Sequence, residues 1–168
     1  LLGGADLVLE LPTPWAAASA ERFARGGVSL LHAAGVVDTL SFGSECGDID
    51  ALRGVADCLD SPEYRDALRR FLDRGLSFAV CRQSAAAELL GEERAALLAQ
   101  PNNNLGIEYI RALRRLNSPI VPTTVRREGQ PHNAPAPDHP AGLSPLSATA
   151  IRQQLAKGNW ELAARYLP

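Results

Sequence analysis

The amino-acid sequence predicts an α/β protein in which a parallel sheet carries a large helical insertion. Three short apolar runs, at residues 6–11, 36–42 and 120–125, have the length and composition of buried strands. A helical pattern lies between the first two runs, which is the order of a βαβ unit with parallel strands. A longer helical stretch at about 48–99 separates the second run from the third. We interpret this stretch as a helical layer or a small lid, because it is larger than a plain crossover requires.

The helices are predicted from apolar spacing and from residues that suit helix ends. The first helix begins after Ser19 and ends at Gly35, a residue typical of the C-terminal cap. Ser61-Pro62 has the pattern of an N-cap followed by proline at the first helical position. The helices predicted within the insertion cover residues 48–59, 61–75, 77–90 and 92–99.

The second half of the chain contains a helix, a strand and a segment without periodicity. A helix is predicted over 105–116, after the polar residues 100–104, with its N-terminus open to an anion. Residues 127–143 contain four prolines and two glycines, which indicates a loop or linker. Helical spacing returns within 144–168.

The composition is that of a globular protein, with 46% hydrophobic residues, 21% charged residues and a net charge of −2. No apolar stretch reaches the roughly 18 residues that a bilayer crossing needs, so no membrane partner is expected. Three cysteines, Cys46, Cys58 and Cys81, form neither a zinc pattern nor a disulfide framework, and reduced thiols indicate a cytoplasmic protein. The chain contains no methionine and opens on Leu1-Leu2, which leads us to expect a truncated start.

Two candidate ligand-binding segments follow predicted strands or precede predicted helices, where ligands of open parallel sheets bind. Gly43 follows the second apolar run, and a residue without a Cβ lets the backbone approach an adenine or a ribose. The alternative is an ordinary turn glycine. Three asparagines, Asn102 to Asn104, precede a helix, and a cap needs only one of them. Asn102 or Asn103 is therefore a candidate ligand of a base or phosphate.

A third candidate segment combines Arg127, at a strand end, with the hydroxyls and the arginine of a later helix. Ser147, Thr149 and Arg152 open that helix, and neutral donors with a guanidinium suit a polyphosphate. The alternative is a Ser/Thr-capped helix with a solvated arginine. No acid/base pair, nucleophile triad or metal-ligand spacing is present, so we predict no catalytic and no metal-binding residue.

Five segments, in their order and approximate spacing, resemble those of the bacterial tRNA(Met) cytidine acetate ligases. They are G-A-D-L-V-L-E-L-P at 4–12, S-A-E-R-F-A-R-G at 19–26, F-G-S-E at 42–45, P-N-N-N-L-G-I-E-Y at 101–109 and S-A-T-A-I-R at 147–152. The similarity extends over nearly the whole chain, and the last two segments together are more specific than either alone.

The resemblance implies a Rossmann-like nucleotidyltransferase fold that is incomplete here. Residues 1–126 would be a partial nucleotide-binding domain, 127–143 a proline-rich loop and 144–168 the start of a C-terminal helical region. The implied activity is that of a ligase in tRNA modification, which activates acetate with ATP as acetyl-adenylate. Acetyl is then transferred to N4 of the wobble cytidine of elongator tRNA(Met). ATP would be a substrate, with Mg²⁺ as a candidate companion ion.

The same resemblance assigns roles to individual residues. Gly43, Asn102 and Arg127 would contact ATP, and the segment at 147–152 would lie near its phosphates. The family's N-P-F-H-x-G-H motif has no counterpart before Leu1, and its histidines would stabilise charge on the phosphoryl group, so we expect the chain alone to be inactive. Pro131-His132-Asn133 stands where the family tends to have a tyrosine-histidine pair. Two alternatives remain: a small-molecule adenylyltransferase of the same fold, and a non-catalytic tRNA-binding module.

Overall fold

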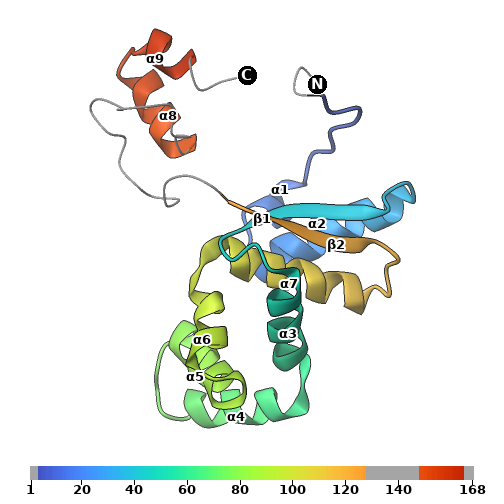
Figure 1. Ribbon diagram of the computed structural model, residues 1–168, viewed down its shortest axis with the longest axis vertical. Helices are drawn as coiled ribbons and strands as arrows, with labels where there is room; N and C mark the ends of the chain where they lie inside the picture. The colour runs from blue at the N-terminus through green and yellow to red at the C-terminus, as the bar shows by residue number, and fades with distance from the viewer. Residues whose placement is uncertain (1–3, 128–147, 165–168) are drawn as a thin grey trace. The chain divides into compact units, whose positions relative to one another are not determined.

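The protein is described by a computed structural model that covers residues 4–127 and 148–164 (Figure 1). Its contacts divide the chain into two compact units, of which the larger is Glu10–Arg127. The second unit consists of Leu1–Leu9 and Glu128–Pro168. Most of the predicted proline-rich loop, and Ser147 after it, lie outside the described residues.

The larger unit contains two strands, and most of its other elements are helices. In chain order its elements are α1 (Thr13–Ala16), α2 (Ala20–Ala34), β1 (Thr39–Ser44), α3 (Ile49–Asp60), α4 (Pro62–Leu72), α5 (Phe78–Leu90), α6 (Glu92–Ala95), the 3₁₀ turn η1 (Ala96–Ala99), α7 (Pro101–Arg115) and β2 (Val121–Arg126). The second unit contains α8 (Ala148–Ala156) and α9 (Trp160–Ala164).

The two strands pair in parallel, as the sequence predicted for an α/β fold. Thr39 lies opposite Val121 at one end of the pair, and Ser44 lies opposite Arg126 at the other. All helices from α3 to α7 lie in the connection between the two strands, which confirms a helical insertion in a parallel crossover. Both strands therefore end at the same edge.

The strand predicted at residues 6–11 is not formed, so the predicted βαβ unit around the first helix is wrong. Residues 7–12 adopt neither helix nor strand. The side chains of Leu7, Val8 and Leu9 are 66%, 69% and 48% exposed. An apolar run becomes a strand only when its backbone N–H and C=O groups find a partner strand, and within the described residues the sheet contains only β1 and β2.

Side-chain caps begin several of the helices where the sequence predicted them. The Asp48 carboxylate accepts from the backbone N–H of Asp50 at 2.9 Å and begins α3. The Ser61 hydroxyl accepts from Tyr64 N at 3.1 Å and begins α4. At the end of α2, Gly35 adopts φ 70°, the left-handed conformation that favours glycine. Capping contacts of this kind each stabilise a helix by about 1 kcal/mol.

Helix α7 begins four residues earlier than predicted. It starts at Pro101 rather than Leu105, so the three asparagines form part of its first turn. Proline suits the first helical position because its fixed φ is helical and its missing N–H has no partner there in any case. The polar segment was therefore misinterpreted as a connection that precedes the helix.

The core lies in two clusters that both use α7. The first joins α7 to the helical insertion and includes Leu52, Val55 and Ile107. The second joins α7 to α2 and to the strands, with Val28 and Leu113 at its centre. Figure 1 shows α2 and α7 beside the strand pair, while α3 to α6 extend away from it. No helix in the described part of the chain has the length and apolar character needed to span a membrane.

Candidate functional site

Three residues predicted to bind a ligand lie together at the edge where both strands end. Gly43 is the second-last residue of β1, Asn102 is in the first turn of α7, and Arg127 follows β2. Arg127 Nη1 donates to Asn102 Oδ1 at 3.0 Å. A Cβ added to Gly43 would lie 3.0 Å from Arg127 Cγ. The structure thus brings together residues that are separated by up to 84 positions (127 − 43) in the sequence.

The N-terminus of α7 is occupied by a carboxylate, so the prediction that it is open to an anion is wrong. Glu45 Oε1 accepts from Asn102 N at 3.1 Å and from Asn102 Nδ2 at 2.6 Å. Its Oε2 accepts from Asn103 N at 2.7 Å. Partial burial opposes the charge of Glu45, but these hydrogen bonds outweigh it and hold the pKa of the carboxyl below its ordinary value. A negative charge is also stabilised there by the helix dipole.

The side chains of the three asparagines bond to different partners. Asn102 contacts Glu45 and Arg127. Asn103 is fully buried, and its Oδ1 accepts from Cys46 N at 3.1 Å. Asn104 Oδ1 accepts from Arg82 Nη1 at 2.9 Å. Of the two candidates that the sequence left open, Asn102 is the one beside Arg127, and Asn103 has a structural role in fixing the loop after β1.

That loop, residues 44–48, is held on both sides. Ser44 is fully buried, and its Oγ accepts from Gly47 N at 3.0 Å and lies 2.8 Å from Thr124 Oγ1 on the neighbouring strand. Arg127 N donates to Ser44 O at 2.8 Å. Gly47 has φ 66°, and a Cβ there would lie 2.6 Å from Arg126 Cβ. The loop and the end of β2 therefore form one tightly packed surface in which glycine is required.

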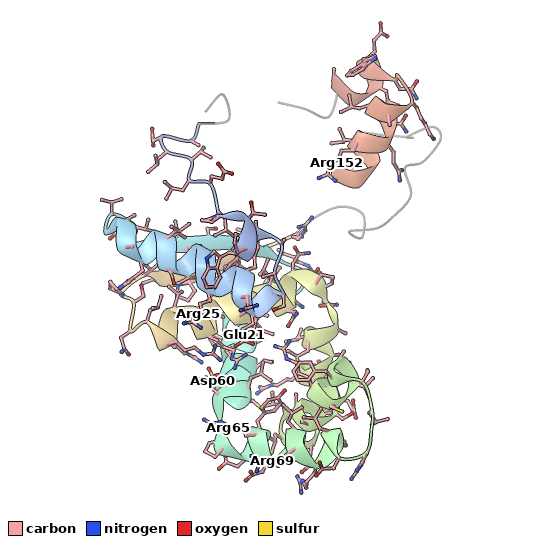
Figure 2. The ribbon with its side chains drawn as sticks, turned by 180° about the vertical axis from the view of Figure 1, so that it is seen from behind. Glu21, Arg25, Asp60, Arg65, Arg69 and Arg152 are labelled. Carbon is pink, nitrogen blue, oxygen red and sulfur yellow. The ribbon has the colours of Figure 1, made fainter. Side chains whose placement is uncertain are left out.

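The remaining predicted site residues lie outside the larger unit or outside the described residues. Ser147 lies outside the described residues. Thr149 and Arg152 belong to α8, which is part of the second unit, and Arg152 is exposed. Figure 2 labels Arg152 on that helix. Within the described residues, no group of three or more His, Cys, Asp or Glu side chains could hold a metal ion.

Comparison with known proteins places the chain in a family. The profile of the HIGH Nucleotidyl Transferase family matches residues 1–168. The chain belongs to this family. Proteins that are similar to it include the tRNA(Met) cytidine acetate ligase of Caldanaerobacter subterraneus subsp. tengcongensis, which is 39% identical over 171 residues. The alignment covers 100% of this chain and 42% of that relative. The ligase of Syntrophotalea carbinolica is 45% identical over 158 residues, which are 92% of this chain and 37% of the relative.

Solved structures agree with the sequence relatives. The apo form I of Thermotoga maritima TmcAL superposes with a TM-score of 0.89 at 36% identity, covering 98% of this chain and 40% of that one. A second crystal form, bound with alpha-thio ATP, gives a TM-score of 0.85 at 35% identity and covers 38% of that chain. The predicted family and its nucleotidyltransferase-like α/β fold are confirmed. The chain spans about two fifths of the length of these relatives.

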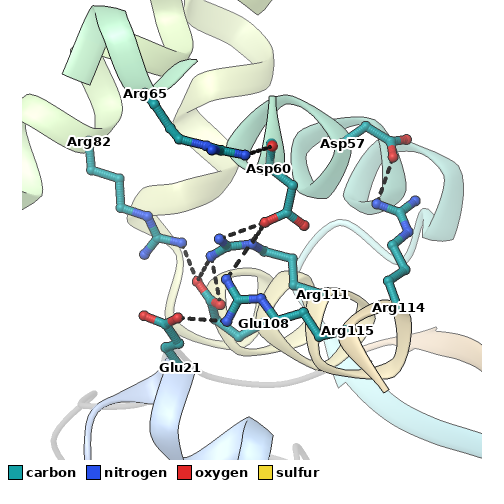
Figure 3. A network of polar contacts seen from close by, with 9 residues as sticks. All are labelled: Glu21, Asp57, Asp60, Arg65, Arg82, Glu108, Arg111, Arg114 and Arg115. Carbon is teal, nitrogen blue, oxygen red and sulfur yellow. Dashed lines mark hydrogen bonds and ion pairs between the residues drawn. The ribbon is translucent and has the colours of Figure 1, made fainter. Parts of the chain in front are cut away.

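A buried ion-pair network, which was not predicted from the sequence, connects several elements of this member of the HIGH nucleotidyl transferases (Figure 3). Glu108 on α7 is 3% exposed and contacts Arg82 Nη2 at 2.5 Å and Arg111 Nη1 at 2.9 Å. Arg111 also binds Asp60, at the end of α3, at 2.8 Å. Burial works against the charge of Arg111, but its bond to Asp60 and the surrounding carboxylates raise the pKa of the guanidinium above its ordinary value.

The network extends to α2 at the protein surface. Arg115 Nη1 lies 2.8 Å from Glu21 Oε1, and this bond lowers the pKa of Glu21 despite its partial burial. Figure 2 shows Glu21 and Asp60 on the same side of the unit. Only the three-residue spacing of Glu108 and Arg111 on one helix could have signalled the network from the sequence.

The role of Glu45 was missed for a different reason. It stands two residues after Gly43 in the F-G-S-E segment, so the sequence placed it near the site. Its partners, the first N–H groups of α7, are more than fifty residues away and could not be identified without the correct start of that helix.

Proposed function

We propose that this chain supplies the ATP-binding part of a tRNA(Met) cytidine acetate ligase. The observation that carries the proposal is the meeting of Gly43, Asn102 and Arg127 at the edge where both parallel strands end. Open α/β sheets bind nucleotides at this edge. The similarity to ligases of that name, and to a structure bound with alpha-thio ATP, supports the assignment.

Each of the three residues offers a group that a nucleotide requires. The Arg127 guanidinium carries five N–H donors in a planar fork, which suits phosphate oxygens and is not exhausted by one bond to Asn102. The amide of Asn102 can both donate and accept. Gly43 has no Cβ, so the ligand and Arg127 can both approach the backbone of β1 closely.

In the proposed reaction, a carboxylate oxygen of acetate attacks the α-phosphorus of ATP. The new O–P bond forms as the bond to the β-phosphate oxygen breaks, which gives acetyl-adenylate and pyrophosphate. N4 of the wobble cytidine of elongator tRNA(Met) then attacks the acetyl carbonyl, and AMP leaves with the bonding electron pair while N4 loses a proton. The residues described here bind and orient ATP, and they form no covalent intermediate.

Further parts of the proposal concern residues and partners away from this edge. Ser147, Thr149 and Arg152 are proposed as additional contacts near the phosphates, because hydroxyls and a guanidinium suit that charge. Mg²⁺ is proposed to enter with ATP, since this ion is usually bound through substrate phosphates. The reaction takes place in the cytoplasm, where tRNA and reduced thiols occur together.

The test uses the full-length protein and acetate-dependent exchange of pyrophosphate into ATP. Arg127→Ala should lower the exchange by about a hundredfold, because a charge-assisted contact to the reacting nucleotide is lost. The matched control is Arg94→Ala, which removes an exposed arginine from α6 and should leave exchange unchanged. Unchanged exchange in the Arg127 variant would remove this residue from the site. Equal exchange with and without acetate would favour an adenylyltransferase that uses another substrate.

A further inference from the structure

Glu45 has an arrangement that goes beyond the capping of a helix. Its two carboxylate oxygens accept three hydrogen bonds, and two of the donors are backbone N–H groups in the first turn of α7. The third donor is the side-chain amide of Asn102, at 2.6 Å. The other end of the same amide accepts from Arg127 at 3.0 Å. Glu45, Asn102 and Arg127 therefore form a chain in which a neutral amide lies between an anion and a cation.

An ionised carboxylate fixes the orientation of the amide. The side chain of asparagine has two nearly equivalent orientations that exchange its donor and its acceptor. With Glu45 ionised, an amide turned by 180° would place Oδ1 against a carboxylate oxygen and Nδ2 against the guanidinium. The turned amide would place an acceptor against an acceptor and a donor against a donor, so Oδ1 is directed toward Arg127 and Nδ2 toward Glu45. Ionised partners at both ends also make these hydrogen bonds stronger than neutral ones.

Glu45 itself has little freedom to move. The backbone donors of Asn102 and Asn103 are fixed by helix α7. The adjacent residue, Cys46, is bonded through its N–H to the buried Asn103 side chain. The hydrogen bonds stabilise the ionised carboxylate of Glu45 and hold its pKa below the ordinary value. An anion with little freedom to move is thus placed against Asn102 and one side chain away from Arg127.

We propose that Glu45 is a positioning residue, which orients the Asn102 amide and through it sets the place of the Arg127 guanidinium for ATP. This inference rests on the proposed ATP site. It assigns to Glu45 no contact with ATP and no step of the reaction. Its consequence is that the effect of Glu45 on ATP depends on the presence of the Asn102 side chain, whereas a simple helix cap would act regardless of it.

The experiment is a double-mutant cycle on the full-length protein, with ATP affinity measured by titration calorimetry in the absence of acetate. The variants are Glu45→Gln, Asn102→Ala and the double variant. Glu45→Gln keeps the size of the side chain but replaces one acceptor oxygen with a donor. We expect ATP affinity to fall by about tenfold, the effect of losing one charge-assisted bond. In the Asn102→Ala background the same change should alter affinity by less than about twofold.

The matched control is Asp48→Asn. Asp48 is also a carboxylate that caps a helix, accepting from Asp50 N and Ala51 N at 2.9 and 3.0 Å. Within the described part of the chain, its carboxylate bonds to neither Asn102 nor Arg127. Its substitution should leave ATP affinity unchanged. Thermal melts of all variants report folding separately. If Glu45→Gln shows no cooperative melt, Glu45→Asp takes its place in the cycle, because it keeps the charge but is too short to reach all three donors.

Equal losses of affinity in the two Asn102 backgrounds would overturn the inference, and so would unchanged affinity in the single Glu45 variant. Failure of the proposed function has a different signature. If the protein binds ATP but shows no acetate-dependent exchange, the ligase assignment is wrong while the cycle still decides the role of Glu45. If the wild-type protein does not bind ATP, both proposals are wrong.

Discussion

Replacing Glu108 by alanine tests whether the buried ion-pair network holds the helical insertion to α7. Glu108 is 3% exposed and lies between Arg82 of α5 and Arg111 of α7. The two arginine side chains are themselves only 18% and 12% exposed. Truncation at Glu108 would leave both guanidinium groups buried without their shared partner.

The expected loss of stability follows from the partners that remain. Removing one member of a buried ion pair costs about 3–5 kcal/mol. Arg111 would keep Asp60 at 2.8 Å, and Arg82 would keep Asn104 at 2.9 Å, so we expect the lower end of that range, about 3 kcal/mol. With an m-value of about 2 kcal/mol/M, the urea midpoint would fall by about 1.5 M.

The assay is urea unfolding followed by far-ultraviolet circular dichroism, with the m-value checked for constancy. The matched control is Glu88→Ala, because Glu88 pairs with Arg70 but both side chains are largely exposed, at 44% and 62%. That variant should lose less than about 1 kcal/mol. The double variant Arg82→Met with Glu108→Leu should be more stable than Glu108→Ala, since apolar residues of similar size leave no unpaired charge at either position.

The outcome that contradicts this prediction is a Glu108→Ala variant that loses no more stability than Glu88→Ala at an unchanged m-value. That result would mean that water or side-chain movement compensates the two arginines, and that the network does not hold α5 against α7.

Three further predictions concern the strand edge and the core. Gly106→Ala should destabilise the protein by about 1–3 kcal/mol in urea unfolding, because its Cβ would lie 2.4 Å from Phe42 Cε2 in the core; an unchanged midpoint would show that Phe42 moves freely. Gly43→Ala should weaken ATP binding by about tenfold in titration calorimetry, because the added Cβ would lie 3.0 Å from the Arg127 side chain and displace it. The melting temperature should change little, since that side chain is flexible. Unchanged affinity would show that ATP binding does not depend on the position of the Arg127 side chain. The ionised Glu45 stabilises the fold fully above its ordinary pKa of 4.5, and this contribution is lost as pH falls through its lower folded-state pKa. In urea unfolding, the free energy of unfolding of Glu45→Gln should therefore fall less steeply below pH 4.5 than that of the wild type. Equal pH dependence of the two free energies would contradict this.

Local sequence signals predicted most helices because their causes are local. Ser61-Pro62 supplies an N-cap and a first helical residue within two positions, and Gly35 supplies the left-handed C-cap. Apolar spacing together with such end signals identified α2 and the helices of the insertion. The same approach misplaced the start of α7, because the asparagines that resemble a turn are held by side chains distant in the sequence.

Residues 6–11 show that an apolar pattern alone does not determine whether a segment forms a strand. A helix satisfies its backbone hydrogen bonds within one segment, whereas a strand requires a neighbour. Leu7 to Leu9 have the composition of a strand but are exposed, and within the described residues they pair with no strand. The runs near 36–42 and 120–125 became strands because they pair with each other.

The sequence by itself determined the family, the α/β class and the identity of Gly43, Asn102 and Arg127 as candidates, because motif strings and helix caps lie within a few neighbouring residues. Only the tertiary structure decided that Asn102 rather than Asn103 meets Arg127, that Glu45 fills the helix N-terminus, and that Glu108 is buried between two arginines. These contacts depend on which polar groups are desolvated beside each other when segments distant in the sequence pack. Desolvation of that kind is a property of the folded arrangement and leaves little trace in the order of residues.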